Sequence, residues 1–435
     1  MGIRRLLYDA AIGLFVALTN VAAVFNDKAR LWVAGRRNWR NTLRRAWPER
    51  SGPTVWIHAA SLGEFEQGRP VIEAVRAQFP GWRIVLTFFS PSGYEIRKNY
   101  PHADLVCYLP ADTRRNAADF LDIVRPDVAV FVKYEFWANY LFELKKRRIP
   151  VLLVSALFRE TQPFFQWYGA FWRDMLGCFT RFFVQNKLSE NLLESIGFQN
   201  VTVAGDTRVD RVLHLAAQAP ENDVVAAFRK SPLTGETLPL LIAGSTWPAD
   251  EAMLTEVMRN GDPEGWKWVF APHDPSAAAV ARLRTLCPKD EAGEVLLYSQ
   301  ANASNATQAP TLLIDNVGLL NTLYRYGHVA YIGGGLGKGI HNTLEPAAFG
   351  LPVIFGPKYE KFEEARQFVA RGGAFVVRNP AELTRVLQQL QDPGFYKKAS
   401  RAVLDYLEES RGATDLILAF FHEHAQIGQI TGGKT

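Results

Sequence analysis

The chain has 435 residues, 48% of them hydrophobic and 21% charged, which describes a globular protein too long for one ordinary core. Its formal net charge of +5 is unevenly distributed, because residues 1–50 hold ten Lys or Arg against three Asp or Glu. Residues 51–435 therefore carry a small acidic excess, which argues against nucleic-acid binding by the body of the protein. The three cysteines are far apart and form no C-x-x-C pair, so we expect a reducing compartment without disulfides.

The first 50 residues have the character of a membrane anchor. Residues 6–25 are the most apolar stretch, but Asp9 near their start leaves an uninterrupted run shorter than the ~20 residues that a span needs. The following segment interleaves arginines with Trp32, Trp39 and Trp47. Apolar helix, aromatic collar and basic cluster together are typical of a segment lying on an anionic membrane. A buried helix with a solvated basic face and a single membrane span are the alternatives.

From Thr54 onward, the chain alternates short apolar, β-branched runs with helical stretches. The predicted strands of the first half are residues 55–59, 83–89, 127–132, 151–155 and 181–185. Those of the second half are residues 238–244, 266–272, 294–299, 311–315, 328–334, 352–356 and 373–377. Strand and helix in alternation predict α/β domains, each with a parallel sheet covered on both faces.

Between the halves the alternation is lost, and scattered Pro and Gly indicate a linker. The predicted domains are an N-terminal anchoring segment (1–50), a Rossmann-like domain (51–215), the linker (216–238), a second Rossmann-like domain (239–392) and C-terminal helices (393–435). In doubly wound domains, ligands bind at the carboxyl ends of the strands. We therefore expect the two sheets to face each other across a ligand cleft.

Two carboxylates directly follow predicted strands of the first half. Glu64 stands three residues after Ser61, so a helix capping box and a general base for a sugar hydroxyl are both open interpretations. Glu135 follows the strand at 127–132 among aromatic residues, and is either a functional carboxylate or a surface acid on a loop. Arg208 either meets negative charge in the cleft or pairs with a neighbouring aspartate.

The second half brings several loops to one predicted sheet edge. Gly244 and Ser245 follow a strand and precede a helix, which is an arrangement that binds anions. The stretch from Gly333 to Ala365 breaks from a strand into glycines, then a short helix and another strand. It matches neither the P-loop nor the dinucleotide fingerprint. The histidines are scattered and no Asp-x-Asp occurs, so we expect no metal site.

Within that glycine-rich stretch, Asn342 and Glu345 stand at the start of the predicted helix. One interpretation is a capping box, in which Asn342 caps the helix and Glu345 reaches back. The other is that Glu345 accepts hydrogen bonds from both ribose hydroxyls of a nucleotide, with a phosphate over the glycines and the helix N-terminus.

Taken together, these segments resemble the Kdo transferases (3-deoxy-D-manno-octulosonic acid transferases) of lipopolysaccharide assembly, over nearly the whole chain. The segments that carry the resemblance are HAASLGEFEQGRP, SPSG at 90–93, the E-x-W-x-N of Glu135, Trp137 and Asn139, GDTRVD, and HNTLEPAAFGLPVIFGP. The chain departs from the family pattern at Pro272-His273-Asp274, where Pro-Arg-His is usual, and at Leu319, where Glu is usual.

The resemblance implies a GT-B fold with two Rossmann-like parallel-sheet domains facing across a cleft and an N-terminal membrane-associated helix. It implies an inverting, metal-independent glycosyltransferase that moves Kdo from CMP-Kdo to a lipid A precursor of the lipid IVA type, without a cofactor, at the cytoplasmic face of the inner membrane. Residues 51–215 would then be the acceptor domain, and residues 239–392 the CMP-sugar-binding domain.

The resemblance also assigns roles to residues. Glu64 matches the general base, and Glu135 and Arg208 match positions that stabilise the transition state. The residues that match the CMP-binding segments are Pro272, His273, Val317, Gly318, Leu319, Asn342, Thr343, Leu344 and Glu345. Gly244 and Ser245 complete the expected anion-binding edge.

Two rival functions remain open. A nucleotide-sugar epimerase has the same two-domain architecture and a helix-start Glu for ribose, but the membrane-binding N-terminus argues against it. A non-catalytic membrane-surface binding protein would keep the fold without turnover. A lipid-linked product would exclude the epimerase, and the absence of CMP-dependent protection against thermal unfolding would favour the binding protein.

Overall fold

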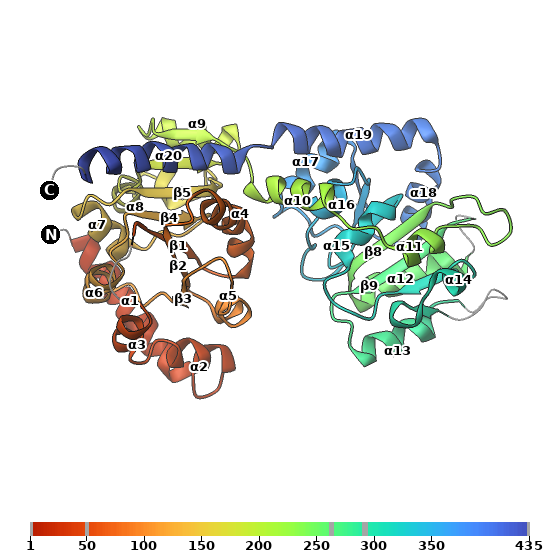
Figure 1. Ribbon diagram of the computed structural model, residues 1–435, viewed down its shortest axis with the longest axis horizontal. Coiled ribbons are helices and arrows are strands. Elements are labelled where there is room, and N and C mark those ends of the chain that lie inside the picture. The colour runs from red at the N-terminus through yellow and green to blue at the C-terminus, as the bar shows by residue number, and fades with distance from the viewer. Residues whose placement is uncertain (1–2, 48–51, 261–264, 289–294, 433–435) are drawn as a thin grey trace. The chain divides into compact units, whose positions relative to one another are not determined.

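The structure is a computed structural model that describes residues 3–47, 52–260, 265–288 and 295–432 (Figure 1). It forms two compact units. Met1–Asp210 and Ser410–Thr435 make the first, here called the N-terminal domain, and Arg211–Glu409 make the second, the C-terminal domain. Each unit contains a seven-stranded parallel sheet, so the prediction of two Rossmann-like α/β domains is confirmed.

The N-terminal domain has the strand order β3-β2-β1-β4-β5-β6-β7. Its strands are β1 (Thr54–Ala59), β2 (Arg83–Phe88), β3 (Leu105–Tyr108), β4 (Val128–Val132), β5 (Val151–Ala156), β6 (Arg181–Val184) and β7 (Val201–Val203). The connecting helices are α4 (Leu62–Gln78), α5 (Pro91–Arg97), α6 (Arg114–Val124), α7 (Ala138–Lys146), η1 (Pro163–Phe165), α8 (Ala170–Leu176) and α9 (Lys187–Ser195).

Strand β1 shows why this sheet has two cores. All six of its residues are buried. Because side chains alternate along a strand, Trp56 enters the core on one face, whereas Val55 and Ile57 enter the core on the other. The strands are therefore apolar throughout, and their carboxyl ends are the places where polar residues reach solvent.

The C-terminal domain has the strand order β10-β11-β9-β8-β12-β13-β14. Its strands are β8 (Leu240–Thr246), β9 (Lys267–Pro272), β10 (Leu296–Leu297), β11 (Thr311–Leu313), β12 (Val329–Ile332), β13 (Val353–Phe355) and β14 (Ala374–Val376). Its helices are α10 (Thr207–Ala217, which begins in the N-terminal domain), α11 (Asp223–Phe228), α12 (Pro248–Arg259), α13 (Ala277–Leu286), η2 (Tyr298–Gln300), α14 (Ala303–Ala306), α15 (Leu320–Leu323), η3 (Tyr324–Tyr326), α16 (Leu344–Ala347), α17 (Glu363–Arg371), α18 (Pro380–Gln389) and α19 (Pro393–Glu409).

Two segments extend these domains beyond their sheets. The segment predicted as a linker, 216–238, contains α11 and an antiparallel bridge between Lys230 and Thr237, and lies in the C-terminal domain. The last helix, α20 (Ala413–Gly432), returns to the N-terminal domain and packs on α4, as Figure 1 shows. Asp210 accepts hydrogen bonds of 2.7 Å from the backbone amides of Gly412 and Thr414 and fixes the start of this return.

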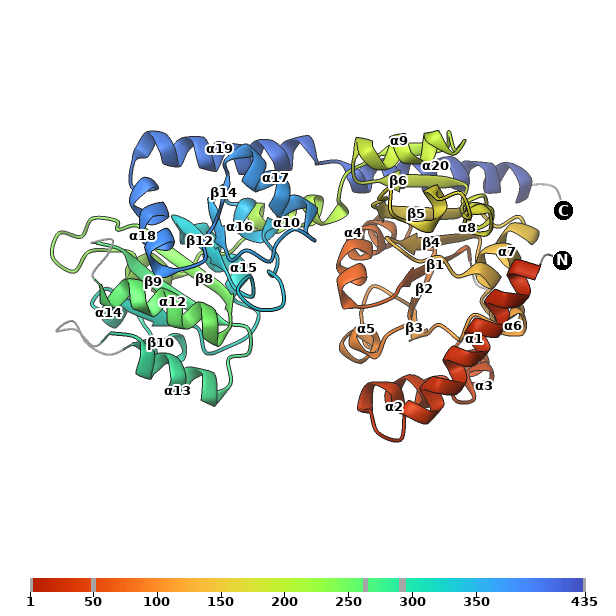
Figure 2. The same ribbon diagram turned by 180° about the vertical axis from the view of Figure 1, so that it is seen from behind.

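Three helices precede the first strand and lie along one side of the N-terminal domain (Figure 2). They are α1 (Ile3–Ala22), α2 (Asp27–Ala34) and α3 (Trp39–Ala46). Trp32 and Trp47 are buried, and Trp39 packs against the core. The predicted aromatic collar on the membrane side is therefore wrong: these large side chains attach α2 and α3 to the domain, and arginines stack on their rings.

Helix α1 contacts the domain through polar side chains. The Tyr8 hydroxyl donates to Asp112 at 2.6 Å, Asn139 Nδ2 donates to Asp9 at 2.9 Å, and Arg5 donates to Asn139 Oδ1 at 3.1 Å. None of its residues is buried, and most of its large apolar side chains are exposed, so the alternative of an ordinary buried helix is excluded. By length and composition α1 could cross a membrane.

Candidate functional site

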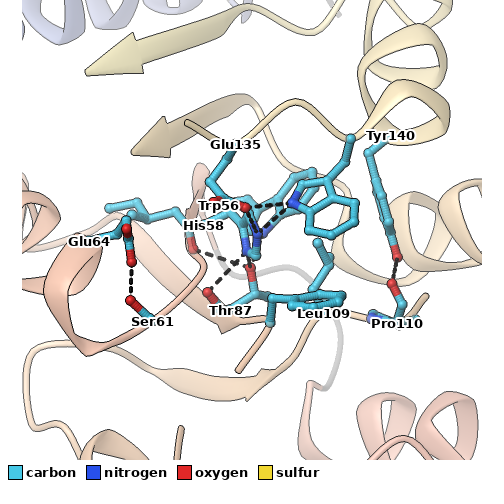
Figure 3. Close-up of polar contacts among 12 residues, drawn as sticks. Trp56, His58, Ser61, Glu64, Thr87, Leu109, Pro110, Glu135 and Tyr140 are labelled. Carbon is cyan, nitrogen blue, oxygen red and sulfur yellow. Dashed lines mark hydrogen bonds and ion pairs between the residues drawn. The ribbon is translucent and has the colours of Figure 1, made fainter. Parts of the chain in front are cut away.

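The first group of predicted site residues lies at the carboxyl edge of the N-terminal sheet. Strand β1 pairs with β2 on one side and with β4 on the other. Glu64 comes after β1, and Glu135 comes after β4. Because the strands are parallel neighbours, their following loops lie at the same edge, as expected from the sequence. Figure 3 shows both carboxylates in this region.

Glu64 lies in the first turn of α4 and is half-buried. The Ser61 hydroxyl donates to Glu64 Oε2, whereas the Ser61 side chain accepts no bond from the helix backbone. The capping interpretation therefore fails on the serine side, since a capping box needs that bond. The Ser61 hydroxyl instead orients the carboxylate, which remains partly open to solvent at the start of the helix.

Glu135 is 6% exposed, so the alternative of a surface acid is wrong. Its Oε2 atom lies 3.0 Å from His58 Nε2 and accepts a hydrogen bond of 2.6 Å from the Trp137 indole. On the other side of the imidazole, Nδ1 lies 2.9 Å from Thr87 Oγ1, which accepts from the Trp56 indole at 2.8 Å. Figure 3 shows His58 between Thr87 and Glu135.

The Trp137 indole contacts both members of this pair, because its nitrogen lies 2.6 Å from Glu135 Oε2 and 3.0 Å from His58 Nε2. On the opposite side, His58 Nδ1 lies 3.1 Å from the Thr87 carbonyl oxygen as well as 2.9 Å from its hydroxyl oxygen. An imidazole from β1 and an indole from the loop after β4 thus fix the Glu135 carboxylate, a partnership that the sequence alone did not predict.

Arg208 lies at the start of α10 and forms an ion pair with Asp206. Pairing with a neighbouring aspartate was one of the two interpretations that the sequence left open. Arg208 Nη2 donates to Asp206 Oδ2 at 2.7 Å, and Gln67 Nε2 donates to the same oxygen at 3.2 Å. Burial acts to raise the pKa of Asp206, but the charge and hydrogen bonds of Arg208 outweigh it and lower that pKa. Gln67 lies on α4, one turn after Glu64, so Arg208 joins the same edge.

The second group lies at the carboxyl edge of the C-terminal sheet. Gly244 and Ser245 lie inside β8, which ends at Thr246, and do not follow the strand as predicted; Ser245 has a positive φ of 52°. Helix α12 follows, and Asp250 in its first turn accepts the Trp247 amide at 2.9 Å and the Gly334 amide at 2.8 Å. A carboxylate therefore already occupies the N-terminus of this helix, which weakens its expected attraction for an anion.

The glycine-rich turn after β12 is tight because backbones pack against each other there. A Cβ at Gly333 would lie 2.3 Å from the Ser245 carbonyl oxygen, and one at Gly335 would lie 2.5 Å from the Gly356 nitrogen. At these two positions the absence of a side chain allows the two backbones to pack closely.

Asn342 and Glu345 form a different arrangement from the predicted capping box. Asn342 Oδ1 accepts the Leu344 amide at 3.1 Å, and its Nδ2 donates to Glu345 Oε1 at 2.9 Å. Glu345 also lines a cavity of about 150 Å³ together with Asn321 and Thr322. The side chains of Thr343 and Leu344 are fully buried.

The remaining predicted residues lie on neighbouring loops. Val317, Gly318 and Leu319 precede α15, which supplies Asn321 and Thr322 to the Glu345 cavity; Val317 is 82% exposed. Pro272 ends β9, and His273 follows it. The structure therefore brings the loops after β8, β9 and β12 to one edge of this domain, because β8 pairs with both β9 and β12.

Three rings stack at this edge, two of them absent from the predicted site. His273 lies between Trp247 and His341, with ring centroids 4.7 Å and 4.5 Å away. The Trp247 indole donates to His341 Nε2 at 3.0 Å. Burial, with a smaller contribution from His273, lowers the pKa of His341 to about 4, so this imidazole is neutral at physiological pH. The signal in the sequence was that Trp247 and His273 each directly follow a strand, whereas His341 comes later, after the glycine-rich turn.

No group of three or more metal-ligating side chains occurs among the described residues. The two edges offer carboxylates, imidazoles, a guanidinium group and backbone donors.

Comparison with known proteins shows which proteins this chain resembles. A family profile described as "3-Deoxy-D-manno-octulosonic-acid transferase (kdotransferase)" matches residues 37–211. A curated 3-deoxy-D-manno-octulosonic acid transferase of Haemophilus influenzae is 25% identical over 378 residues, 84% of this chain and 85% of that protein. That of Chlamydia pneumoniae is 24% identical over 74% of each chain. The chain is therefore similar to Kdo transferases over most of its length. It is a glycosyltransferase.

Solved structures agree on the fold. The calicheamicin glycosyltransferase CalG4 superposes with a TM-score of 0.55 at 13% identity, covering 86% of this chain and 99% of that one. UDP-GlcNAc 2-epimerase from Neisseria meningitidis superposes with a TM-score of 0.57 at 16% identity, covering 85% and 100%. These similarities confirm the predicted GT-B architecture. The epimerase likeness concerns the fold alone.

Proposed function

We propose that this chain transfers Kdo from CMP-Kdo to a lipid A precursor, with inversion at the anomeric carbon and without a metal ion. The observation that carries the proposal is the family match over residues 37–211, because it spans Glu64, Glu135 and Arg208. These three side chains come from neighbouring strand ends and an adjoining helix at one sheet edge.

In this proposal Glu64 acts as the general base. Its carboxylate takes the proton of an acceptor hydroxyl, the oxygen bonds to the anomeric carbon of Kdo, and CMP leaves with the electron pair of the broken bond. Negative charge grows on the departing phosphate, so a cation placed beside it lowers the barrier. Arg208 is suited to this task because Asp206 holds its guanidinium in one orientation.

The donor would bind at the edge of the C-terminal domain. Glu345 would accept hydrogen bonds from the two ribose hydroxyls, supported by the Asn342 amide group. The cavity of about 150 Å³ beside Glu345 is smaller than pockets that enclose a whole ligand, and suits the sugar of the nucleotide. Gly318 and His273, on the flanking loops, would then approach the base and the phosphate.

The acceptor would be reached from the membrane. Helix α1 exposes apolar side chains such as Leu14, Leu18 and Val21, and the helices after it carry most of the basic excess. An enzyme with a soluble acceptor has no need of such a surface. We therefore place the protein on the cytoplasmic face of the inner membrane, where a lipid-borne hydroxyl meets the N-terminal domain.

The test is incubation of the full chain, reconstituted in vesicles, with CMP-Kdo and the lipid A precursor, followed by mass analysis of the lipid. We expect the lipid to gain the mass of one or more Kdo residues. Glu64→Gln should lower turnover about a thousand-fold. Glu66→Gln, which changes a carboxylate two positions further along α4, should leave turnover unchanged. Normal turnover by Glu64→Gln would exclude Glu64 as the base.

A further inference from the structure

A cavity of about 530 Å³ lies between the three N-terminal helices, beside the loops that follow β2 and β3. Its volume falls within the range of small-molecule binding sites. Helix α1 contributes Val16 and Asn20, the region of α2 and α3 contributes most of the wall, and the loop before α6 closes it. The residues that line it are Val16, Asn20, Trp32, Val33, Arg36, Arg37, Asn38, Trp39, Arg40, Asn41, Ala111 and Asn116.

The cavity wall is positively charged. Three arginines line it and, among the described residues, no acidic side chain does. Arg40 is paired with Asp119 at 2.6 Å, outside the lining. Arg37 is exposed and forms no ion pair with a described residue. The wall therefore carries more positive charge than its neighbours neutralise, and it favours an anion.

Arg36 adds to the excess of positive charge in the cavity wall. Three of its donors go to backbone carbonyls, those of Leu109 and Phe89 at 2.8 Å and that of Trp32 at 3.1 Å, and its guanidinium stacks on the Trp32 ring. No described carboxylate pairs with it. Burial lowers the pKa of Arg36 to about 9, which records the cost of a cation without a counter-charge.

The cavity adjoins the apolar surface of α1. Val16 and Asn20 face the cavity, one helical turn apart. Leu14, Leu18 and Val21 on the same helix are each at least 60% exposed. An amphiphile placed here would have its anionic head among the arginines and asparagines and its acyl chains along α1.

We propose that the cavity between α1, α2 and α3 binds the phosphate-bearing headgroup of a membrane lipid, with Arg37 and Arg36 facing the phosphate and the asparagines facing the headgroup hydroxyls. Two sources supply this chemistry: an anionic phospholipid of the bilayer, or the phosphorylated glucosamine lipid that the proposed function takes as acceptor. Only the second source rests on the proposed function.

The experiment measures binding of the full chain to neutral phosphatidylcholine vesicles that carry either phosphatidylglycerol or a phosphorylated glucosamine lipid at equal surface charge. Arg37→Gln is compared with Arg44→Gln, which removes the same charge from an exposed position on α3 outside the cavity. We expect Arg37→Gln to weaken binding about five-fold more than Arg44→Gln does. Asn41→Trp, which fills the cavity without changing charge, should reproduce the loss.

The two lipids separate the sources. A selective loss with phosphatidylglycerol supports a bulk phospholipid, and a selective loss with the glucosamine lipid, abolished by removing its phosphates, supports the acceptor. Equal losses for Arg37→Gln and Arg44→Gln with both lipids, or normal binding by Asn41→Trp, would overturn the proposal, because diffuse surface charge would then explain the attraction. Binding needs no turnover, so failure of the transferase assay leaves this result interpretable.

Discussion

At the scale of single residues, the most informative contact is that of His58 with Glu135. His58 is fully buried within β1, and Glu135 follows the paired strand β4. The sequence predicted where Glu135 falls, because a carboxylate at the end of an apolar strand is visible in one dimension. It could not predict the partner, since that depends on the register between two strands that are about seventy residues apart.

The His58 contact leads to a prediction for catalysis. His58→Leu should lower kcat about 100-fold, because a small displacement of an oriented group is costly. His58→Gln, whose amide can donate from near the Nε2 position, should recover part of the loss. The measurement is kcat and KM for both variants across pH. We expect KM for the donor to change little, since His58 lies in the N-terminal domain.

An effect of these substitutions on folding stability has to be distinguished from an effect on the position of Glu135. The melting temperatures of both variants should be measured with that of Thr87→Val, which removes the hydroxyl behind the imidazole while leaving the Glu135 contact in place. If His58→Leu and Thr87→Val lost activity only in proportion to their loss of folded protein, His58 would have a structural role alone.

At the scale of elements, α1 is unusual because its polar side chains face the protein and its apolar ones face outward. Arg5, Tyr8 and Asp9 bind the domain, and Phe15, halfway along the helix, packs on Trp32 with ring centroids 5.6 Å apart. A helix held along its length by the domain is not free to cross a bilayer away from it. This geometry favours a helix lying in the membrane surface.

The orientation of α1 can be measured with single cysteines at its two ends. In vesicles with the catalytic domain outside, Arg4→Cys and Asn26→Cys should both react with a membrane-impermeant maleimide. The native cysteines are buried or half-buried and provide a low background. Labelling of Asn26→Cys alone, with Arg4→Cys reacting only after the vesicles are opened, would show that α1 spans the bilayer.

The docking of α1 also makes stability depend on pH. Burial, with a smaller contribution from Asp9 and against the hydrogen bonds that Asp112 accepts, raises the pKa of Asp112 to about 6. The unfolded value is about 3.9. Between these values the folded protein binds more protons, so this group's contribution to the free energy of unfolding falls as pH rises from about 4 to 6, by roughly 3 kcal/mol.

Asp112→Asn removes this titration. The melting temperature of the wild type minus that of the variant, measured by calorimetry, should therefore decrease between pH 4.5 and pH 7. As a control for the loss of a carboxylate, Asp119→Asn changes an acid on α6 that is paired with Arg40 and does not contact α1. A difference that rises with pH would contradict the raised pKa.

The sequence predicted elements correctly where their position depends on hydrophobic periodicity and on polar residues at strand ends. It failed where their position depends on tertiary contacts. Most of the parallel strands were predicted because they are apolar on both faces, whereas the partly buried edge strand β3 was missed. The three tryptophans were misplaced, because Arg and Trp in alternation describe a membrane collar and a cation–π attachment equally well; only the packing of Trp47 under Arg83, 3.4 Å from the ring centroid, distinguishes them.

At the scale of the whole molecule, the chain leaves the N-terminal domain once and returns to it. Ala413, Ile417 and Phe421 of α20 belong to the same core as Val55 and Ile57 of β1. Sequence position gives no sign of this return, because a C-terminal amphipathic helix suits either domain. The sequence was sufficient to predict two α/β domains. It was not sufficient to predict to which of them the last helix belongs.

The division into two domains makes a last prediction, in which donor binding and proton transfer are separable. Glu64 and Glu345 belong to different domains, and each carboxylate accepts a hydrogen bond from a residue three positions earlier, Ser61 or Asn342. Glu64→Ala should therefore abolish transfer while the Kd for CMP, measured by calorimetry, stays within about two-fold of wild type. Glu345→Ala should weaken CMP binding about 100-fold, the cost of two charge-assisted hydrogen bonds.

Asp315→Ala is a matched control for Glu345→Ala, because Asp315 also lies on a loop of the C-terminal domain and binds Ser299 instead of facing the cavity. It should leave both transfer and CMP affinity unchanged. If Glu64→Ala weakened CMP binding as much as Glu345→Ala did, the two carboxylates would act on one ligand, and Glu64 would be a donor-binding residue and not the base. If Glu345→Ala lost turnover without losing CMP affinity, the ribose assignment would be wrong, and the carboxylate at the helix start would serve the chemical step instead.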